Sequence, residues 1–334
     1  MINKNVFDPG VFSSRVCYYR LGRHAFLAAL NMLGLQPGEK ILLPAIVCRD
    51  LLAAVHAIDG VPVFYEVGQD MGPIAFPVEK VRAVIAVNYF GFPQDLSLFR
   101  KYCADTGAIL IEDNAHGFLS CDVSGALLGT RGDIGFFSIR KTFAVPDGAL
   151  LMVNDATLRN WLPEQLPFRK GSLSPGFFIQ NGLRWLQKNI GINFLMMGRR
   201  AARLIRYVRT GYFIAPMVPE SEFEMPGMPE PHMYLLKVLP KFDQEKEISR
   251  RRKLYHTFHS KFASIGIQPV FDSLPEGVAP YGYPFFATGE ALQKARSIAG
   301  SMGLDCIPWP DLPNAIEKDA LFHYRSLLIV NFIC

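Results

Sequence analysis

The chain of 334 residues lacks the marks of several protein classes. Its six cysteines form no C-x-x-C pair, so we expect neither a metal site nor a disulfide framework, and a reducing cytoplasm fits best. No apolar stretch approaches the ~18 residues of a membrane span. Residues 1–14 lack a basic patch followed by an apolar run, so we expect no signal peptide.

Acidic residues are missing from one long segment. Between Gln165 and Pro219 there is no Asp or Glu, although nine of the 35 Lys and Arg residues fall there. The rest of the chain therefore carries 26 basic and 30 acidic residues, a net of −4, against +5 for the whole. Apolar residues recur at helical spacing over 183–190 and 201–208. We predict basic helices in this segment.

The residues that are present indicate a globular protein with a sizeable core, since 50% are apolar and 19% are charged. Strand-length apolar runs alternate with helical patterns from Tyr19 to about Asn154. The predicted strands are 40–44, 61–67, 83–89, 108–111, 135–139 and 149–153, and the predicted helices are 25–33, 50–59 and 96–105. Continuous apolar runs suit strands buried on both faces. We predict a three-layer α/β domain with a parallel sheet.

The pattern changes after Asn154. A connector rich in Pro, Met and Glu spans 220–231, and one helix is predicted from Met233 to about Phe262. Strands near 283–287 and 304–308 flank a helix at 291–302. We predict three parts: a large domain (15–160), a basic helical insert with its connector (161–230), and a small α+β C-terminal domain (231–334).

Two of the predicted strands end in residues that can do chemistry. In open α/β sheets, ligands bind at the carboxyl ends of strands. One strand runs directly into Glu112 and Asp113, with His116 following. An acid there can hold a protonated heterocycle, a metal or a ribose, or it can simply cap the next turn. Lys141 follows another strand, where desolvation beside other cations would make it a Schiff-base nucleophile; the alternative is an ordinary surface lysine.

A third feature is Gly22 at the start of the first predicted helix. A glycine there lets backbone N–H groups approach a phosphate, although many such glycines are only loop residues.

Taken in order, the segments resemble the DegT/DnrJ/StrS aminotransferases, a sugar aminotransferase group of fold type I enzymes. Six motifs are in register: Gly22–Phe26 (G-T-x-A-L), Pro44–Cys48 (P-x-x-T-F), Gly60–Phe64, Val87–Asp95 (V-H-L-Y-G-x-P-x-D), Glu112–His116 (E-D-x-A-Q/H) and Gly132–Ile139 (G-D-x-x-x-x-S-F).

The resemblance implies an aspartate aminotransferase-like large domain that binds pyridoxal 5'-phosphate in a homodimer. Lys141 would hold the cofactor as a Schiff base and shuttle a proton between the substrate carbon and the cofactor carbon. Asp113 would keep the pyridine nitrogen protonated, which makes the ring an electron sink. His116 would lie near the phenolic oxygen or the ring.

The phosphate would be held by Ser138 and the backbone at Gly22 and Arg23, and Arg23 would add a charge that the usual Thr lacks.

Several features depart from the family pattern. Cys48 stands where an aromatic ring usually stacks on the cofactor, and Asn88 replaces the usual His. Lys141 lies three positions after Ser138 instead of the usual five, which we interpret as a two-residue deletion. We find no counterpart of the Asn segment that crosses the dimer, nor of a final helix.

The resemblance implies transfer of an amino group, from glutamate first of all, to a nucleotide-linked keto-sugar in polysaccharide or secondary-metabolite synthesis. One alternative is a sugar dehydratase, although those relatives usually lack the lysine. Another is a catalytically degenerate member that serves as a binding or scaffold protein. A Rossmann dehydrogenase is a poor fit because no G-x-G-x-x-G is present, and we expect no nucleic-acid partner.

The basic residues over 184–209 leave three interpretations open. They can form a solvated helix face, bind the diphosphate of a nucleotide-linked substrate, or rest on an anionic membrane surface.

Overall fold

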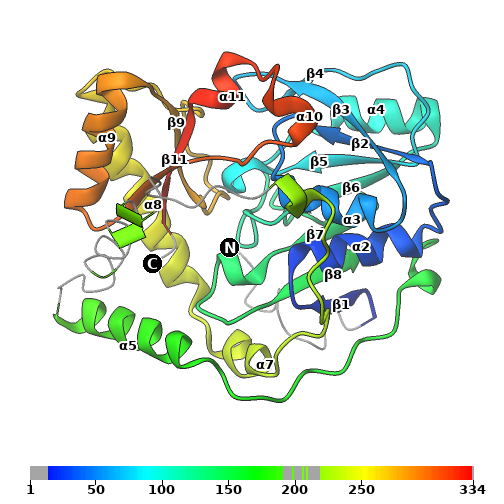
Figure 1. Ribbon diagram of the computed structural model, residues 1–334, viewed down its shortest axis with the longest axis horizontal. Coiled ribbons are helices and arrows are strands. Elements are labelled where there is room, and N and C mark those ends of the chain that lie inside the picture. The colour runs from blue at the N-terminus through cyan, green and yellow to red at the C-terminus, as the bar shows by residue number, and fades with distance from the viewer. Residues whose placement is uncertain (1–13, 191–197, 199–204, 207, 210–218, 333–334) are drawn as a thin grey trace.

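The computed structural model describes residues 14–190, 198, 205, 206, 208, 209 and 219–332 (Figure 1). The larger of its two sheets has the strand order β1-β8-β7-β6-β5-β2-β3-β4. These strands are β1 (Val16–Tyr19), β2 (Lys40–Pro44), β3 (Val61–Val67), β4 (Pro73–Ala75), β5 (Ala83–Val87), β6 (Ile109–Asn114), β7 (Ile134–Phe137) and β8 (Ala149–Val153). The five from β7 to β3 are parallel, as predicted.

The edges of this sheet differ from the predicted parallel arrangement. β8 pairs antiparallel with β7, and β1 pairs antiparallel with β8. β4 pairs antiparallel with β3. β1 and β4 were not predicted, and at three residues β4 is too short to show a period. β6 extends past its predicted end at Ile111, since the polar side chains of Glu112 and Asn114 find partners inside the protein.

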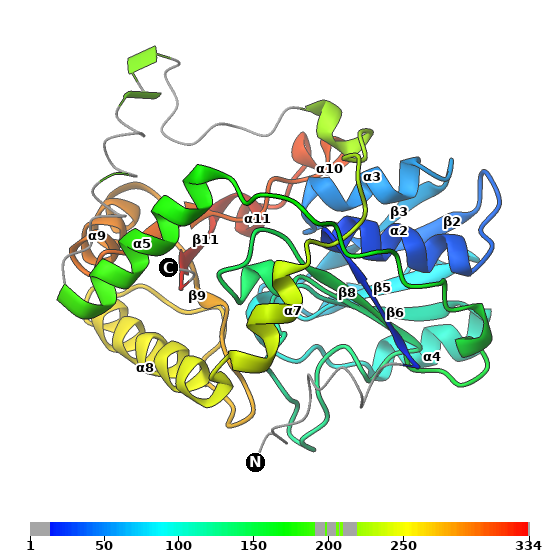
Figure 2. The same ribbon diagram turned by 90° about the horizontal axis from the view of Figure 1, so that it is seen from below.

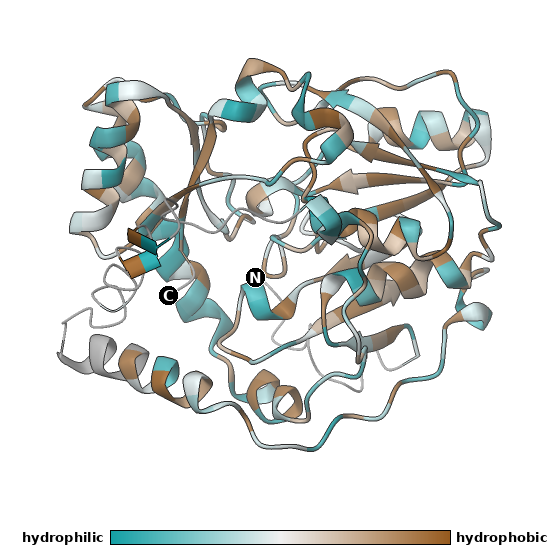
Figure 3. Cartoon of the chain, in the orientation of Figure 1, coloured by the Kyte–Doolittle hydropathy of each residue, from teal (hydrophilic) through white to brown (hydrophobic). Residues whose placement is uncertain are grey.

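Helices cover both faces of the large sheet. α2 (Gly22–Met32) and α3 (Leu52–His56) lie on one face, and α4 (Ser97–Thr106) lies on the other (Figure 2). Every residue of β5 and β8 is buried. The strands are correspondingly hydrophobic along their length (Figure 3). Burial on both faces explains their continuous apolar sequence, and the three-layer α/β prediction is confirmed.

The C-terminal part contains an antiparallel sheet of order β10-β11-β9. Its strands are β9 (Gly282–Phe286), β10 (Asp305–Pro308) and β11 (Leu327–Asn331). Helices α8 (Gln244–Ala263) and α9 (Gly289–Ser301) accompany it, and the short helices α10 (Asn314–Glu317) and α11 (Phe322–Ser326) precede β11. Buried residues of both sheets belong to one continuous hydrophobic cluster, so the two parts share an interface.

The single helix predicted from Met233 to about Phe262 is wrong. The chain instead forms α7 (Tyr234–Val238), a 3₁₀ turn at Leu239–Lys241, and then α8. Pro240 lacks the N–H that a continuous helix needs. Asp243 then starts α8 as its N-cap, with Oδ1 accepting a hydrogen bond of 3.0 Å from the Lys246 N–H.

The basic segment is described only in part. The helical pattern over 183–190 is confirmed by α5 (Pro175–Ile190), which lies at the periphery of the molecule (Figure 1). Of the helix predicted over 201–208, the described residues Ile205, Arg206 and Val208 are helical, and the other five lie outside the described residues, as do Arg199 and Arg200. None of the helices in the described ranges combines the length and apolar character that a bilayer-spanning segment requires.

Candidate active site

The carboxyl ends of four neighbouring parallel strands lie side by side. Asp113 lies near the end of β6, and Lys141, Asn88 and Cys48 follow the ends of β7, β5 and β2 respectively. A small cavity of about 30 Å³ lies at this edge, lined by Val47, Cys48, Val87, Asp113, Ala115, His116, Lys141 and Trp309. Four of the predicted site residues therefore share one cavity: Lys141, Asp113, His116 and Cys48.

Lys141 reaches the cavity from a 3₁₀ turn, Ile139–Lys141, that directly follows β7. Its backbone N–H donates to the Ser138 carbonyl at 3.1 Å, which holds the turn tight. Its side-chain Nζ lies 3.1 Å from His116 Nε2 and 5.9 Å from the centre of the Tyr281 ring. A lysine held in this way differs from the ordinary surface lysine that the sequence left open.

His116 is fixed between aromatic rings. Its imidazole stacks on Tyr281 at 4.2 Å and 18°, and Phe90 lies nearly parallel to it at 5.9 Å and 8°. Burial lowers the pKa of His116 well below its usual value, and the charges of Lys141 and Arg251 lower it further. The ring is therefore uncharged at neutral pH, and we assign its Nε2 as the acceptor of a hydrogen from Lys141 Nζ.

Asp113 has two features that bear on the alternatives for an acid here. Its Oδ1 accepts a hydrogen bond of 2.9 Å from the Ala115 N–H, so it does cap the following turn. It also lines the cavity, where burial raises its pKa to about 6, while the hydrogen bond and the charge of Lys141 act the other way. A carboxylate in such a place is stabilised by a bound cation.

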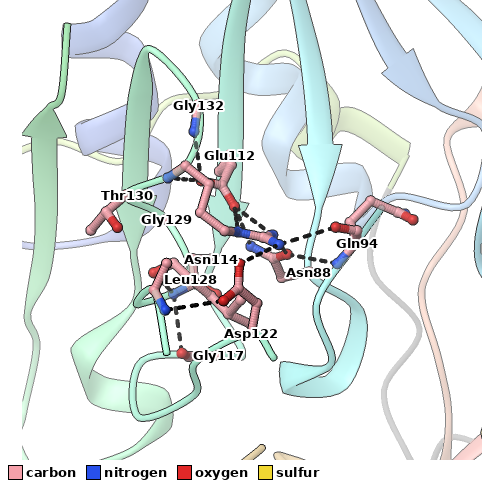
Figure 4. Close-up of polar contacts among 12 residues, drawn as sticks. Asn88, Gln94, Glu112, Asn114, Gly117, Asp122, Leu128, Gly129, Thr130 and Gly132 are labelled. Atoms are coloured by element: carbon pink, nitrogen blue, oxygen red, sulfur yellow. Dashed lines mark hydrogen bonds and ion pairs between the residues drawn. The ribbon is translucent and has the colours of Figure 1, made fainter. Parts of the chain in front are cut away.

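The neighbouring acid, Glu112, serves a different purpose. Consecutive strand residues point to opposite faces, so Glu112 turns away from Asp113 into a polar network (Figure 4). It is fully buried, and its carboxylate accepts hydrogen bonds from the Arg131 guanidinium at 2.8 Å and from the Gly132 N–H at 2.8 Å. Asn88 Nδ2 donates to Glu112 Oε2 at 3.1 Å. Asn88, a departure from the family pattern, thus ties β5 to β6.

The residues predicted to hold the phosphate are partly brought together. A Cβ added to Gly22 would be 3.8 Å from the Ser138 Cβ, so the start of α2 and the end of β7 are adjacent. Leu21, the N-cap of α2, offers no side-chain acceptor to the N–H groups of the first turn. The Arg23 guanidinium is ion-paired with Asp50. Gly22, Arg23 and Ser138 are not among the residues that line the cavity.

Three aromatic residues at the site were not predicted to belong to it: Phe90, Tyr281 and Trp309. Phe90 lies inside a motif that the sequence identified, but Tyr281 and Trp309 come from the C-terminal part. A tryptophan flanked by prolines just past a predicted strand was the available signal for Trp309. Within the described ranges, no group of three or more His, Cys, Asp or Glu side chains forms a metal site.

Known proteins give two kinds of comparison. The model of the DegT/DnrJ/EryC1/StrS aminotransferase family matches residues 20–206. A dTDP-4-dehydro-2,3,6-trideoxy-D-glucose 4-aminotransferase of Saccharopolyspora spinosa is 28% identical over 157 residues, 45% of this chain and 40% of that protein. A UDP-N-acetyl-3-dehydro-alpha-D-glucosamine 3-aminotransferase of Acidithiobacillus ferrooxidans is 28% identical over 150 residues, 42% of this chain and 40% of that protein. The matched part thus spans less than half the length of these relatives.

Solved structures show the same fold over nearly the whole chain. The aminotransferase TlmJ from Streptoalloteichus hindustanus superposes with a TM-score of 0.64 at 19% identity, covering 98% of this chain and 83% of that one. An E. coli GDP-4-keto-6-deoxy-D-mannose-3-dehydratase with bound hydrated PLP gives a TM-score of 0.59 at 16% identity, covering 97% and 85%. At such identities the likeness concerns the fold.

Proposed function

Because the chain belongs to the DegT/DnrJ/EryC1/StrS aminotransferase family, we propose that it is a pyridoxal-phosphate-dependent aminotransferase acting on a nucleotide-linked keto-sugar. The observation that carries the proposal is the meeting of Lys141, His116 and Asp113 in one cavity at the carboxyl edge of the sheet. The amino group of an amino acid, with glutamate as first choice, replaces the keto oxygen of the sugar, and the donor leaves as a 2-oxo acid.

The residues present fit pyridoxal phosphate. Lys141 offers a primary amine at the cavity. Burial raises the pKa of Asp113, and a positively charged ring nitrogen beside it would stabilise its carboxylate. Gly22 and Ser138 bring a helix start next to the turn that carries Lys141, and backbone N–H groups at a helix start favour a phosphate. When bound, the cofactor delocalises the electron pair that remains on the substrate carbon after a proton is removed.

The protein's own side chains have separable tasks in this proposal. Lys141 holds the cofactor and then moves the proton at its Nζ between substrate and cofactor carbons. His116, uncharged and stacked between rings, fixes the position of Nζ through its Nε2. Phe90, Tyr281 and Trp309 keep water away from the reacting atoms by lying around the imidazole.

The finer parts of the proposal rest on different grounds. Both relatives described above are named for aminating a keto-sugar on a nucleotide, which supports that substrate class. We further propose a homodimer, because fold type I sites are commonly completed by a partner subunit. A reducing, cytoplasmic setting agrees with the described cysteines, none of which is in a disulfide.

The test is to add pyridoxal phosphate to the pure protein, record its visible absorbance, and then supply glutamate with a panel of nucleotide-linked keto-sugars. An amino sugar and 2-oxoglutarate are the expected products. A product that loses a hydroxyl group without gaining nitrogen would replace the proposal with a dehydratase. Absence of any visible band would leave a binding or scaffold protein. Light scattering of the active protein measures its molar mass and so tests the proposed homodimer. A fully active monomer would contradict that proposal.

A further inference from the structure

Two flat side chains line the cavity, His116 and Trp309, and the larger of them comes from the C-terminal part. Cys48, at the position where the family usually has an aromatic ring, lines the cavity with a small thiol. The other apolar lining residues, Val47, Val87 and Ala115, are also small. Trp309, which directly follows β10, is the apolar lining residue with a ring large enough to cover a planar ligand.

Trp309 is tied to the very segment that carries Cys48. The Arg49 N–H donates to the Asp311 carbonyl at 2.9 Å, and Arg49 Nε donates to the Leu312 carbonyl at 2.8 Å. The two residues that follow Pro310 are therefore fixed against the residue that follows Cys48. Trp309 and Cys48 face the same cavity because these two short segments are bound to each other.

Arg49 is well placed to keep this connection rigid. Its side chain is 5% exposed and forms ion pairs with Glu317 at 2.8 Å and Glu222 at 3.6 Å. A buried guanidinium that is paired on several sides has few alternative positions. The loop from Trp309 to Leu312 is thus held by charge and by backbone hydrogen bonds together.

The orientation of the indole is also fixed. Its ring meets Phe90 at 4.8 Å and 65°, Tyr89 at 5.8 Å and 87°, and His116 at 5.4 Å and 63°. These edge-to-face contacts hold the Trp309 ring in one orientation. Trp309 is only partly buried, which leaves part of its ring for a ligand.

We propose that Trp309 supplies the aromatic wall for the cofactor ring in place of the residue at Cys48, and that Arg49 is the positioning residue that sets it. The inference rests on the proposed cofactor. It assigns a cofactor-contacting residue to the C-terminal part of the chain, so that part contributes directly to holding the cofactor.

The test uses the fluorescence of Trp309 itself. Tryptophan emission overlaps the absorbance of pyridoxal phosphate bound to a lysine, so a tryptophan next to the cofactor is quenched strongly when the cofactor binds. The chain has three tryptophans, Trp161, Trp185 and Trp309. Most of the quenching should disappear in Trp309→Phe, whereas Trp161→Phe, which alters a side chain that is 58% exposed, should leave it in place.

Cofactor retention gives the second measurement. Trp309→Ala should bind pyridoxal phosphate roughly three- to tenfold more weakly, as expected for loss of one aromatic contact. Adding Cys48→Phe to that variant should recover most of the loss, since a ring returns to the same cavity. Arg49→Lys should reduce the quenching of Trp309 although the indole is still present. If Trp309→Ala does not fold, the same comparison is made with Trp309→Leu, with folding checked by circular dichroism.

The outcomes separate the two levels of the proposal. If the parent protein shows no visible band with pyridoxal phosphate, the proposed function fails. If the band forms but Trp309→Phe keeps the full quenching and Trp309→Ala keeps full retention, the cofactor assignment stands and the role of Trp309 is overturned. Unchanged quenching in Arg49→Lys would remove the positioning role of Arg49 alone.

Discussion

Lys141 Nζ and His116 Nε2 lie 3.1 Å apart at the end of two adjacent strands, and the imidazole is stacked between Tyr281 and Phe90. The histidine cannot swing away without losing its ring contacts. The amine of Lys141 is consequently held over the cavity even in the absence of a ligand, which lowers the entropy cost of binding one.

Replacement of this lysine gives the first prediction. Lys141→Ala should abolish both the visible absorbance with pyridoxal phosphate and the amino transfer, because it is the lysine that lines the cavity. The measurements are an absorbance titration and a coupled assay for 2-oxoglutarate. Lys101→Ala, at an exposed position of α4, serves as the control and should behave like the parent. A visible band that survives in Lys141→Ala contradicts the assignment.

The second prediction concerns Asp113→Asn and has two parts. Turnover should fall strongly, because an amide cannot stabilise a protonated ring nitrogen. The variant should nonetheless be more stable than the parent when no cofactor is present. Near-normal turnover would mean that Asp113 serves only as a turn cap.

The stability part depends on pH in a defined direction. Burial raises the pKa of Asp113 from 3.8 to about 6, so the folded protein binds this proton more tightly than the unfolded chain. Stability of the parent therefore falls as the pH rises from about 4 to about 6, and the loss is complete above that range. Asp113→Asn removes this loss. The melting temperature of Asp113→Asn should exceed that of the parent at pH 8, and the two values should converge near pH 4. If the variant and the parent differ by the same amount at both pH values, ionisation of Asp113 is not the cause.

The third prediction addresses the basic segment, whose role the described residues leave open. Arg199→Glu, Arg200→Glu and Arg203→Glu together should weaken binding to anionic vesicles if the segment rests on a membrane, by about 1 kcal/mol or more per residue near the surface. If the segment binds a diphosphate, the triple variant should raise the KM for the sugar nucleotide. Co-sedimentation and kinetics measured in parallel decide between them, with Lys101→Glu as the charge-matched control. No change in either measurement would make the segment structural.

The sequence was sufficient to predict which side chains meet at the strand ends. Lys141 and Cys48 each follow a parallel strand closely and Asp113 lies at the end of another, so the geometry of the sheet brings them together once the strands are known. Trp309 and Tyr281 could not be predicted in the same way, because their approach depends on how the C-terminal part packs on the large sheet.

Side-chain partners within the large sheet were equally beyond a sequence-based prediction. From the sequence, Asn88 is only a replacement of the family's usual His, and its hydrogen bond to Glu112 is visible only in the structure. Arg131 lies 19 residues from Glu112 in sequence, in a turn-rich stretch without a periodic pattern. The sequence marked the acidic pair Glu112 and Asp113 as important, but the separation of their roles required the opposite directions in which the two side chains point.

The last prediction follows from that separation. The Glu112 side chain is fully buried, and Arg131 is its main partner. The backbone N–H and the guanidinium of Arg131 donate to the Glu112 carboxylate at 2.6 Å and 2.8 Å respectively. Removing one member leaves a buried charge without its partner, so Arg131→Met should destabilise the protein by about 3–5 kcal/mol in urea unfolding. Glu112→Gln alone should also destabilise it, because the neutral amide cannot accept all of these bonds.

The double variant provides the decisive comparison. Glu112→Gln combined with Arg131→Met removes both charges, so its loss of stability should be clearly smaller than the sum of the two single losses. Arg100→Met is a suitable control, since Arg100 is an exposed arginine that donates to the Arg131 carbonyl at 3.3 Å and pairs with no buried acid. Arg100→Met should lower the free energy of unfolding by less than about 1 kcal/mol. Strictly additive losses in the double variant would mean that the two residues are not coupled, and that Glu112 is held by the backbone of the turn instead.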